Sequence, residues 1–176
     1  MFKAQLRQQA KAHRLALTPD QLAAAQGALQ RQWAQLDLQA YQHLMLYVPM
    51  PGRREPDTLP LLPDLWAQGK QLYTSVTHWE QRQLELVPWE PHTQFTLNAW
   101  GIPEPASGPE LSPLLLDAVV VPLLACDIHG QRLGYGQGFY DRFLAQCRPE
   151  VYTIGLSFFE PYPPFEEVLP LSLIHI

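Results

Sequence analysis

Three glycines at alternate positions, flanked by two arginines, form the stretch of this sequence whose residue types best suit chemistry. Residues 127–142 read Asp-Ile-His-Gly-Gln-Arg-Leu-Gly-Tyr-Gly-Gln-Gly-Phe-Tyr-Asp-Arg. Gly134, Gly136 and Gly138 carry no Cβ, so successive backbone N–H groups can approach an anion closely. Arg132 and Arg142 add two cations of the kind that bind polyphosphates. The spacing therefore favours a phosphate-binding loop.

The glycines alone leave the function of this loop open. A tight turn after a strand is the more common role of such glycines, and the loop lacks both the Gly-x-Gly-x-x-Gly spacing and the Lys-Ser/Thr ending of known phosphate loops. Asp141 also has two interpretations. It is either a ligand that holds Mg²⁺ against the phosphates or an ordinary acidic residue in the first turn of a helix.

The segments around this loop predict alternating strands and helices. Residues 114–125 are almost wholly apolar, which is typical of a strand buried on both faces, and the spacing after Gly138 predicts a helix over 139–147. Other apolar patterns predict helices at 2–17, from Thr18 to about 36, and at 58–68, and strands at 44–48, 71–76 and 151–156. Short strands at 84–87 and 95–97 are expected as a hairpin. The alternation indicates an α/β fold with a largely parallel sheet covered on both faces.

Several other conspicuous residues have ordinary interpretations. The charged stripe of the first helix is best explained as a solvated face, and each of three tryptophans is more simply core packing than a roof over a flat ligand. The stripe is Lys3, Arg7, Lys11 and Arg14, and the tryptophans are Trp79, Trp89 and Trp100. The six histidines show no metal-ligand spacing, and no Ser/His/Asp or Cys/His nucleophile arrangement stands out.

Composition limits the class of protein. A chain of 176 residues with 47% hydrophobic residues suits one domain with a single core. Its net charge of −5 argues against non-specific binding to nucleic acid or to anionic membranes, and no apolar run of about 18 residues is present to span a bilayer. Two cysteines and a start without an apolar signal core indicate the cytoplasm.

The long motif at residues 127–142 resembles the signature of the 5-formyltetrahydrofolate cyclo-ligase (methenyltetrahydrofolate synthetase) family. The resemblance is supported by Lys3 and Arg7, by Glu-Pro-Asp-Thr at 55–58 and by Gly-Ile-Pro-Glu-Pro at 101–105, and it covers about residues 2–170. It implies a three-layer α/β/α, Rossmann-like fold of the NagB/RpiA/CoA-transferase type. It also implies MgATP-driven cyclisation of 5-formyltetrahydrofolate to 5,10-methenyltetrahydrofolate by a monomeric cytoplasmic enzyme, with release of ADP and phosphate through a phosphorylated formyl intermediate.

The resemblance also implies roles for individual residues. Arg132 and Tyr140 are expected to be catalytic, and Asp141 to bind Mg²⁺. The residues expected to bind ATP are Lys3, Arg7, Arg132, Leu133, Gly134, Tyr135, Gly136, Gln137, Gly138, Phe139 and Tyr140. Those expected to bind the folate are Val48, Glu55, Tyr135, Gly136, Gln137, Gly138 and Phe139.

Two departures from the family pattern keep alternatives open. Arg53 and Arg54 look like an insertion before Glu55, and a His-Asp motif expected after Leu169-Pro170, with a second magnesium aspartate, is missing. We therefore expect a single domain at 1–170, truncated at its carboxyl end. Residues 171–176 are interpreted as a non-native tail translated from a sequencing adapter. The alternatives are a folate- or nucleotide-binding protein without turnover and a sugar-phosphate isomerase or acyl-CoA-handling enzyme on a similar scaffold.

Overall fold

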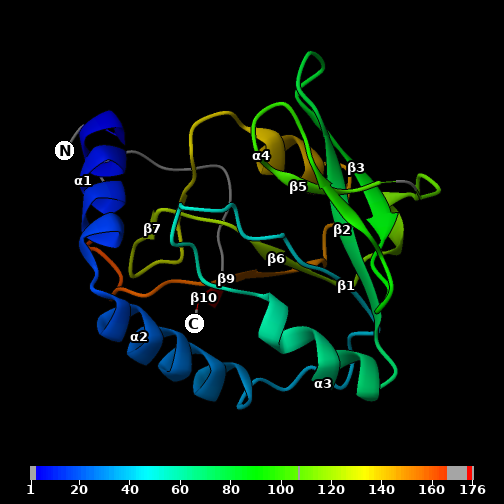
Figure 1. Ribbon diagram of the computed structural model, residues 1–176, viewed down its shortest axis with the longest axis horizontal. Coiled ribbons are helices and arrows are strands. Elements are labelled where there is room, and N and C mark those ends of the chain that lie inside the picture. The colour runs from blue at the N-terminus through cyan, green and yellow to red at the C-terminus, as the bar shows by residue number, and fades with distance from the viewer. Residues whose placement is uncertain (1–2, 107, 166–173, 176) are drawn as a thin grey trace.

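A mostly parallel sheet forms the centre of the protein in a computed structural model, which describes residues 3–106, 108–165 and 174–175 (Figure 1). Its six strands lie in the order β10-β9-β6-β1-β2-β3. They are β1 (His43–Met45), β2 (Gln71–His78), β3 (Gln83–Pro88), β6 (Ala118–Val121), β9 (Tyr152–Gly155) and β10 (Ile174–His175). The β2–β3 pair is antiparallel and the other pairs are parallel. This confirms the predicted largely parallel α/β sheet.

Alternate residues of the central strands face two separate cores. Leu44 of β1 and Val120 of β6 pack with residues of α2 (Pro19–Trp33) and α3 (Leu62–Ala67). Met45 and Val119 face the opposite side and pack with residues of α4 (Phe139–Leu144). Because successive side chains of a strand point to opposite faces, the sheet is covered on both sides. Figure 1 shows α2 and α3 below the sheet and α4 above it, which confirms the three-layer arrangement.

The first two helices begin where the sequence predicts. Helix α1 (Lys3–Ala16) buries Leu6 and Ala10 against Leu124, Ala125 and Leu133. Before α2, the Thr18 hydroxyl accepts a hydrogen bond from the Gln21 backbone at 3.2 Å, and the Gln21 side chain accepts one from the Thr18 N–H at 2.9 Å. This capping box satisfies two backbone donors at the start of the helix.

The predicted strand at 114–125 is divided in the structure. A 3₁₀ turn (Pro113–Leu115) precedes β6, and Pro122 follows it, which ends the strand because proline cannot donate to the sheet. The chain then forms β7 (Ala125–Cys126), which pairs antiparallel with β8 (Arg132–Leu133). The loop predicted at 127–142 therefore begins within a small β-hairpin, which the sequence did not predict. The helix expected over 139–147 ends at Leu144.

The expected hairpin between 84–87 and 95–97 is also wrong. Strand β3 pairs with β2, whereas β4 (Phe95–Leu97) pairs antiparallel with β5 (Pro103–Pro105) in a separate two-stranded sheet. The helix predicted at 58–68 begins later, at Leu62, because Pro60 lies in a preceding 3₁₀ turn (Leu59–Leu61) and Pro63 lies in the first turn of α3.

The suspected tail at 171–176 lies mostly outside the described residues. Only Ile174–His175 are described there, as β10 beside β9. Within the described part of the chain, no helix has the length and apolar character needed to cross a membrane.

Candidate active site

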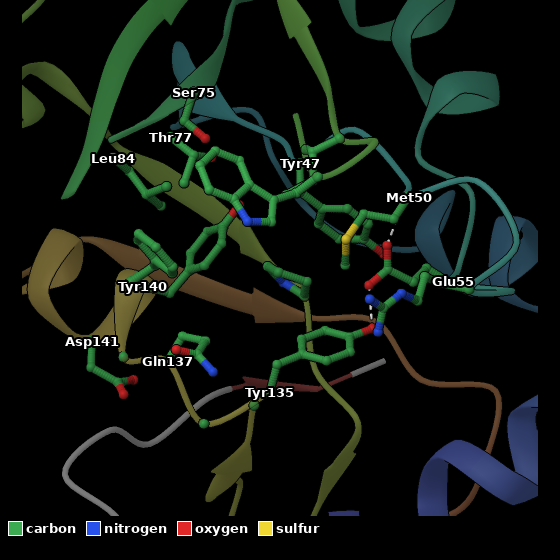
Figure 2. Close-up of a pocket in the computed structure, with 18 of the residues that line it drawn as sticks. Tyr47, Met50, Glu55, Ser75, Thr77, Leu84, Tyr135, Gln137, Tyr140 and Asp141 are labelled. Carbon is green, nitrogen blue, oxygen red and sulfur yellow. Dashed lines mark hydrogen bonds between the residues drawn. The ribbon is translucent and has the colours of Figure 1, made fainter. Parts of the chain in front are cut away.

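A cavity of about 680 Å³ opens where the parallel strands end, between the glycine-rich loop and the segment after β1 (Figure 2). Val48 comes from beyond the carboxyl end of β1 and Pro122 from the carboxyl end of β6. Ligands of open α/β sheets bind at this edge. Of the residues expected to bind ATP or folate, all but Lys3 line the cavity. Lys3 lies at the start of α1, and its predicted role in ATP binding stays a prediction.

An arginine packs against each of the three alternate glycines. A Cβ added at Gly134 would lie 2.9 Å from Nη1 of Arg132. A Cβ added at Gly136 would lie 3.3 Å from Cζ of Arg7, and one added at Gly138 would lie 3.0 Å from Nη1 of Arg142. Arg7 also donates from Nε to the carbonyl of Gly134 at 2.9 Å. The glycines thus admit three guanidinium groups directly onto the loop backbone. This local concentration of positive charge suits a polyphosphate.

Arg132 and Asp141 form an ion pair inside the cavity. Nη2 of Arg132 donates to Oδ1 of Asp141, and Nη1 donates to the carbonyl of Pro122 at 3.2 Å. The Arg132 side chain is only 7% exposed, whereas that of Asp141 is 46% exposed. In the described part of the chain, the buried Nε of Arg132 has no hydrogen-bond partner. The arginine therefore keeps an unused donor, and the aspartate keeps access to solvent.

Asp141 supplies one carboxylate, which suits magnesium only where phosphate oxygens complete the coordination. Among the described residues, no three His, Cys, Asp or Glu side chains lie close enough together to hold a metal ion. Magnesium in nucleotide sites is commonly held by one or two carboxylates together with substrate phosphates and water. Asp141 lies at the glycine-loop end of the cavity (Figure 2) and fits this pattern as a single carboxylate ligand.

At the other end of the cavity, Glu55 belongs to a chain of hydrogen bonds (Figure 2). Its Oε2 accepts from the backbone N–H of Met50 at 2.8 Å, and its Oε1 accepts from the hydroxyl of Tyr135. The Tyr135 oxygen in turn accepts from Nη2 of Arg14. Glu55 is 7% exposed and Arg14 is 5% exposed. The glycine loop, the loop after β1 and helix α1 therefore meet at one polar cluster.

The loop that carries Glu55 is fixed by its neighbours. The Tyr47 hydroxyl donates to the carbonyl of Pro56 and the Thr58 hydroxyl donates to the carbonyl of Tyr47, both at 2.7 Å. The Gln26 side chain of α2 exchanges two hydrogen bonds with the backbone of Asp57, at 2.8 and 2.9 Å. These contacts fix the loop that positions the Glu55 carboxylate.

The two arginines before Glu55 take up separate positions. Arg54 adopts a positive φ of 49° and donates to the carbonyls of Leu15 and Leu17, so it joins the loop to the end of α1. Arg53 lines the cavity instead, with its Cζ 6.0 Å from the ring centroid of Tyr135.

Two tyrosines of the cavity remain protonated over a wide pH range. Burial, followed by the nearby negative charge of Glu55, raises the pKa of Tyr140 and that of Tyr135 well above the ordinary value for a phenol. Figure 2 shows the Tyr140 ring directed toward Ser75 and the Tyr135 ring directed toward Glu55. Both hydroxyl groups are therefore hydrogen-bond donors at neutral pH.

Sequence analysis missed several residues that line or support the cavity. Arg14 was expected on a solvated face and is buried, and Lys11 lines the cavity with its Nζ 5.7 Å from the Tyr135 ring centroid, so that interpretation is wrong for both. Trp79 and Trp100 stack with centroids 4.5 Å apart and also line the cavity, whereas the third tryptophan, Trp89, packs in the core as expected. The sequence held a clue for Trp100 alone, which directly precedes the 101–105 motif.

The sequence matches the model of the 5-formyltetrahydrofolate cyclo-ligase family over residues 1–159. It is 35% identical over 128 residues to 5-formyltetrahydrofolate cyclo-ligase of Escherichia coli K12, covering 68% of this chain and 70% of that protein. It is 30% identical over 121 residues to the mouse protein of the same name, covering 62% of this chain and 60% of that protein.

Two solved structures are also similar. The NMR structure of Aquifex aeolicus 5,10-methenyltetrahydrofolate synthetase has a TM-score of 0.78 and 27% identity, covering 98% of this chain and 87% of that chain. A 5,10-methenyltetrahydrofolate synthetase from Mycoplasma pneumoniae has a TM-score of 0.75, covering 99% of this chain and 97% of that chain. Its identity of 19% extends the likeness to the fold alone.

Proposed function

This chain belongs to the 5-formyltetrahydrofolate cyclo-ligase family, and we propose that it catalyses the ATP-dependent cyclisation of 5-formyltetrahydrofolate to 5,10-methenyltetrahydrofolate. ADP and phosphate are the other products. The comparisons give no support to a binding protein without turnover or to a sugar-phosphate isomerase. The proposal includes a monomeric protein in the cytoplasm that acts on two small molecules.

The reaction requires activation of a poor leaving group. The oxygen of the formamide accepts the γ-phosphoryl group of ATP, which breaks the bond to ADP and forms a phosphorylated formyl group. The N10 nitrogen of the folate then attacks the formyl carbon, the phosphate departs with the former formyl oxygen, and the N10 proton is released. Because phosphoryl transfer involves little covalent chemistry by the protein, its residues act mainly by positioning and by charge stabilisation.

The glycine-loop end of the cavity supports binding of the triphosphate. Three guanidinium groups lie against the loop backbone, those of Arg7, Arg132 and Arg142. Gly138, the residue before α4, has no side chain, so the backbone N–H groups of the first turn have no side-chain cap. Asp141 would hold Mg²⁺, which when bound neutralises phosphate charge. Arg132, which contacts Asp141 through Nη2 and has an unused Nε donor, would bind phosphate beside that carboxylate.

The opposite end of the cavity supports binding of the folate. Glu55 offers carboxylate oxygens to the N–H groups of the substrate, and Val48 adds an apolar contact. The stacked indoles of Trp79 and Trp100 offer a flat wall for an aromatic ring system on another side of the cavity, beside Phe139, whose ring centroid lies 5.0 Å from that of Trp79. Tyr140 also lines the cavity, and its protonated hydroxyl can donate to an oxygen of the reacting group.

The single observation that carries this proposal is the meeting, in one cavity, of the three arginine–glycine contacts and the Glu55 carboxylate. The test is the rise in near-ultraviolet absorbance of methenyltetrahydrofolate after the protein is mixed with 5-formyltetrahydrofolate, ATP and Mg²⁺. A rise that requires ATP is expected. An ATP-independent rise would contradict the mechanism, and no rise under any condition would contradict the proposed activity.

A further inference from the structure

Arg14 occupies an unusual position for a helix-surface cation. It lies near the carboxyl end of α1, is 5% exposed, and donates from Nη1 to the carbonyl of Leu123 at 3.2 Å and from Nη2 to the hydroxyl of Tyr135. It does not line the cavity itself. A buried guanidinium is costly unless its charge is balanced, so its partners indicate its purpose.

The directions of the hydrogen bonds in this cluster are fixed by chemistry. Arginine can only donate, so the Tyr135 oxygen accepts from Arg14. The pKa of Tyr135 is raised, first by burial and then by the charge of Glu55, so the phenol keeps its single proton and donates it to Oε1 of Glu55. The negative charge of Glu55 thus balances the positive charge of Arg14 through one shared hydroxyl.

This arrangement leaves part of the Glu55 carboxylate for a ligand. An ionised carboxylate has about four acceptor positions. The Met50 N–H takes one on Oε2 and the Tyr135 hydroxyl takes one on Oε1. The two contacts come from different loops and hold both oxygens, so the carboxylate plane is defined before any substrate arrives.

The Tyr135 ring is held as well as its hydroxyl. Nζ of Lys11 lies 5.7 Å from the ring centroid, and Cζ of Arg14 lies 5.7 Å from it. These cations stand over an aromatic face, which attracts positive charge. Helix α1 therefore restrains the tyrosine at two points, and the tyrosine lies within the glycine loop.

We propose that Arg14 is a positioning residue for the folate substrate: acting through the Tyr135 hydroxyl, it orients and charge-balances the Glu55 carboxylate. This inference rests on the proposed function, because it assigns Glu55 to the folate. Removal of the relay should weaken folate binding more than ATP binding, since Arg132 and Arg142 of the phosphate end contact Asp141 and the Gln137 carbonyl instead of the relay.

The test is a double-mutant cycle with Arg14→Met, Tyr135→Phe and the combined variant. Affinity for 5-formyltetrahydrofolate is measured by calorimetry without ATP, and the KM for each substrate is measured where turnover occurs. Each single change should weaken folate affinity about 10- to 100-fold, the range for a hydrogen bond to a charged group. In the Tyr135→Phe background, Arg14→Met should weaken it further by less than about 3-fold. Arg31→Met, on the exposed part of α2, is the matched control and should change neither affinity nor KM.

Arg14→Lys keeps a positive charge in the same place and should recover part of the lost affinity for 5-formyltetrahydrofolate. If Arg14→Met does not fold, Arg14→Lys takes its place in the cycle. Effects of the two single changes that multiply in the combined variant would overturn the inference. An equal rise of the KM values for ATP and folate would do the same, because it would indicate a general structural role. Folate binding by the wild-type protein without ATP-dependent turnover would refute the proposed activity, and the affinities would still decide the role of Arg14. No folate binding by the wild-type protein would overturn both.

Discussion

Replacement of Arg132 by alanine should reduce activity far more than stability. The change removes the ion pair with Asp141, whose side chain is 46% exposed, and a hydrogen bond of 3.2 Å to the Pro122 carbonyl. A partly exposed pair contributes roughly 0–1 kcal/mol and a single hydrogen bond about 1 kcal/mol, so the free energy of unfolding should fall by about 1–2 kcal/mol. Loss of a donor that stabilises transferring charge costs about 10²–10³-fold in rate, or about 3–4 kcal/mol.

Arg148→Ala is the matched control for this prediction. Arg148 also joins one carboxylate and one carbonyl, with Nη2 2.6 Å from Oδ1 of Asp117 and 2.9 Å from the oxygen of Leu116, but it does not line the cavity. Thermal unfolding should show similar losses of stability in the two variants. The absorbance assay, run at several ATP concentrations, should show a raised KM for ATP and a lowered kcat for Arg132→Ala only. Equal activity in the two variants would refute the role given to Arg132.

Other substitutions test the loop and the scaffold. Gly136→Ala places a Cβ at a φ of +92° and 3.3 Å from Cζ of Arg7, so it should lower stability by about 1–2 kcal/mol and also lower activity; Gly69→Ala, at a φ of +78° with open space around it, should cost similar stability and leave turnover unchanged. Burial alone would raise the pKa of the Asp127 carboxyl, but three backbone N–H donors lower it below its usual value. The ionised Asp127 carboxylate therefore stabilises the folded state above the unfolded-state pKa of about 4, and this stabilisation is lost as pH falls through the lower folded-state pKa. Asp127→Asn should lower the free energy of unfolding by about 1–3 kcal/mol at pH 7 and by progressively less below pH 4, measured by chemical denaturation. Thr18→Ala removes the cap of α2 and should lower the free energy of unfolding by about 1 kcal/mol, measured by thermal melting, with unchanged turnover.

Local patterns predicted much of the fold because they depend on neighbouring residues. The start of α2 after Thr18 and the glycine loop need no information from distant parts of the chain. The pairing of β3 was mispredicted for the opposite reason. Residues 84–87 and 95–97 are close in sequence, yet each forms a ladder with another partner, β2 or β5, and such choices depend on tertiary packing.

The supporting residues of the site were harder to predict than its motif. A basic stripe on α1 has the same sequence pattern whether the helix faces water or covers the glycine loop. Burial of Leu6 and Ala10 against β7 and β8 turns that stripe toward the cavity, and this contact depends on a hairpin that the sequence did not indicate. The same contact explains why Arg14 is buried and why Lys11 reaches Tyr135.

The distribution of charge reconciles an acidic protein with an anionic substrate. Among the described residues, six of the chain's twelve Lys and Arg residues line the cavity, but only Glu55 and Asp141 of its seventeen Asp and Glu residues do. The net charge of −5 therefore combines a positively charged cavity with a more strongly acidic remainder of the chain, and the local field of the cavity is positive. The two carboxylates lie at opposite ends and each contacts a different partner, Arg132 or the Arg14–Tyr135 relay. Under the proposed function, this separation would let one end accept phosphate and metal while the other accepts the N–H groups of the folate.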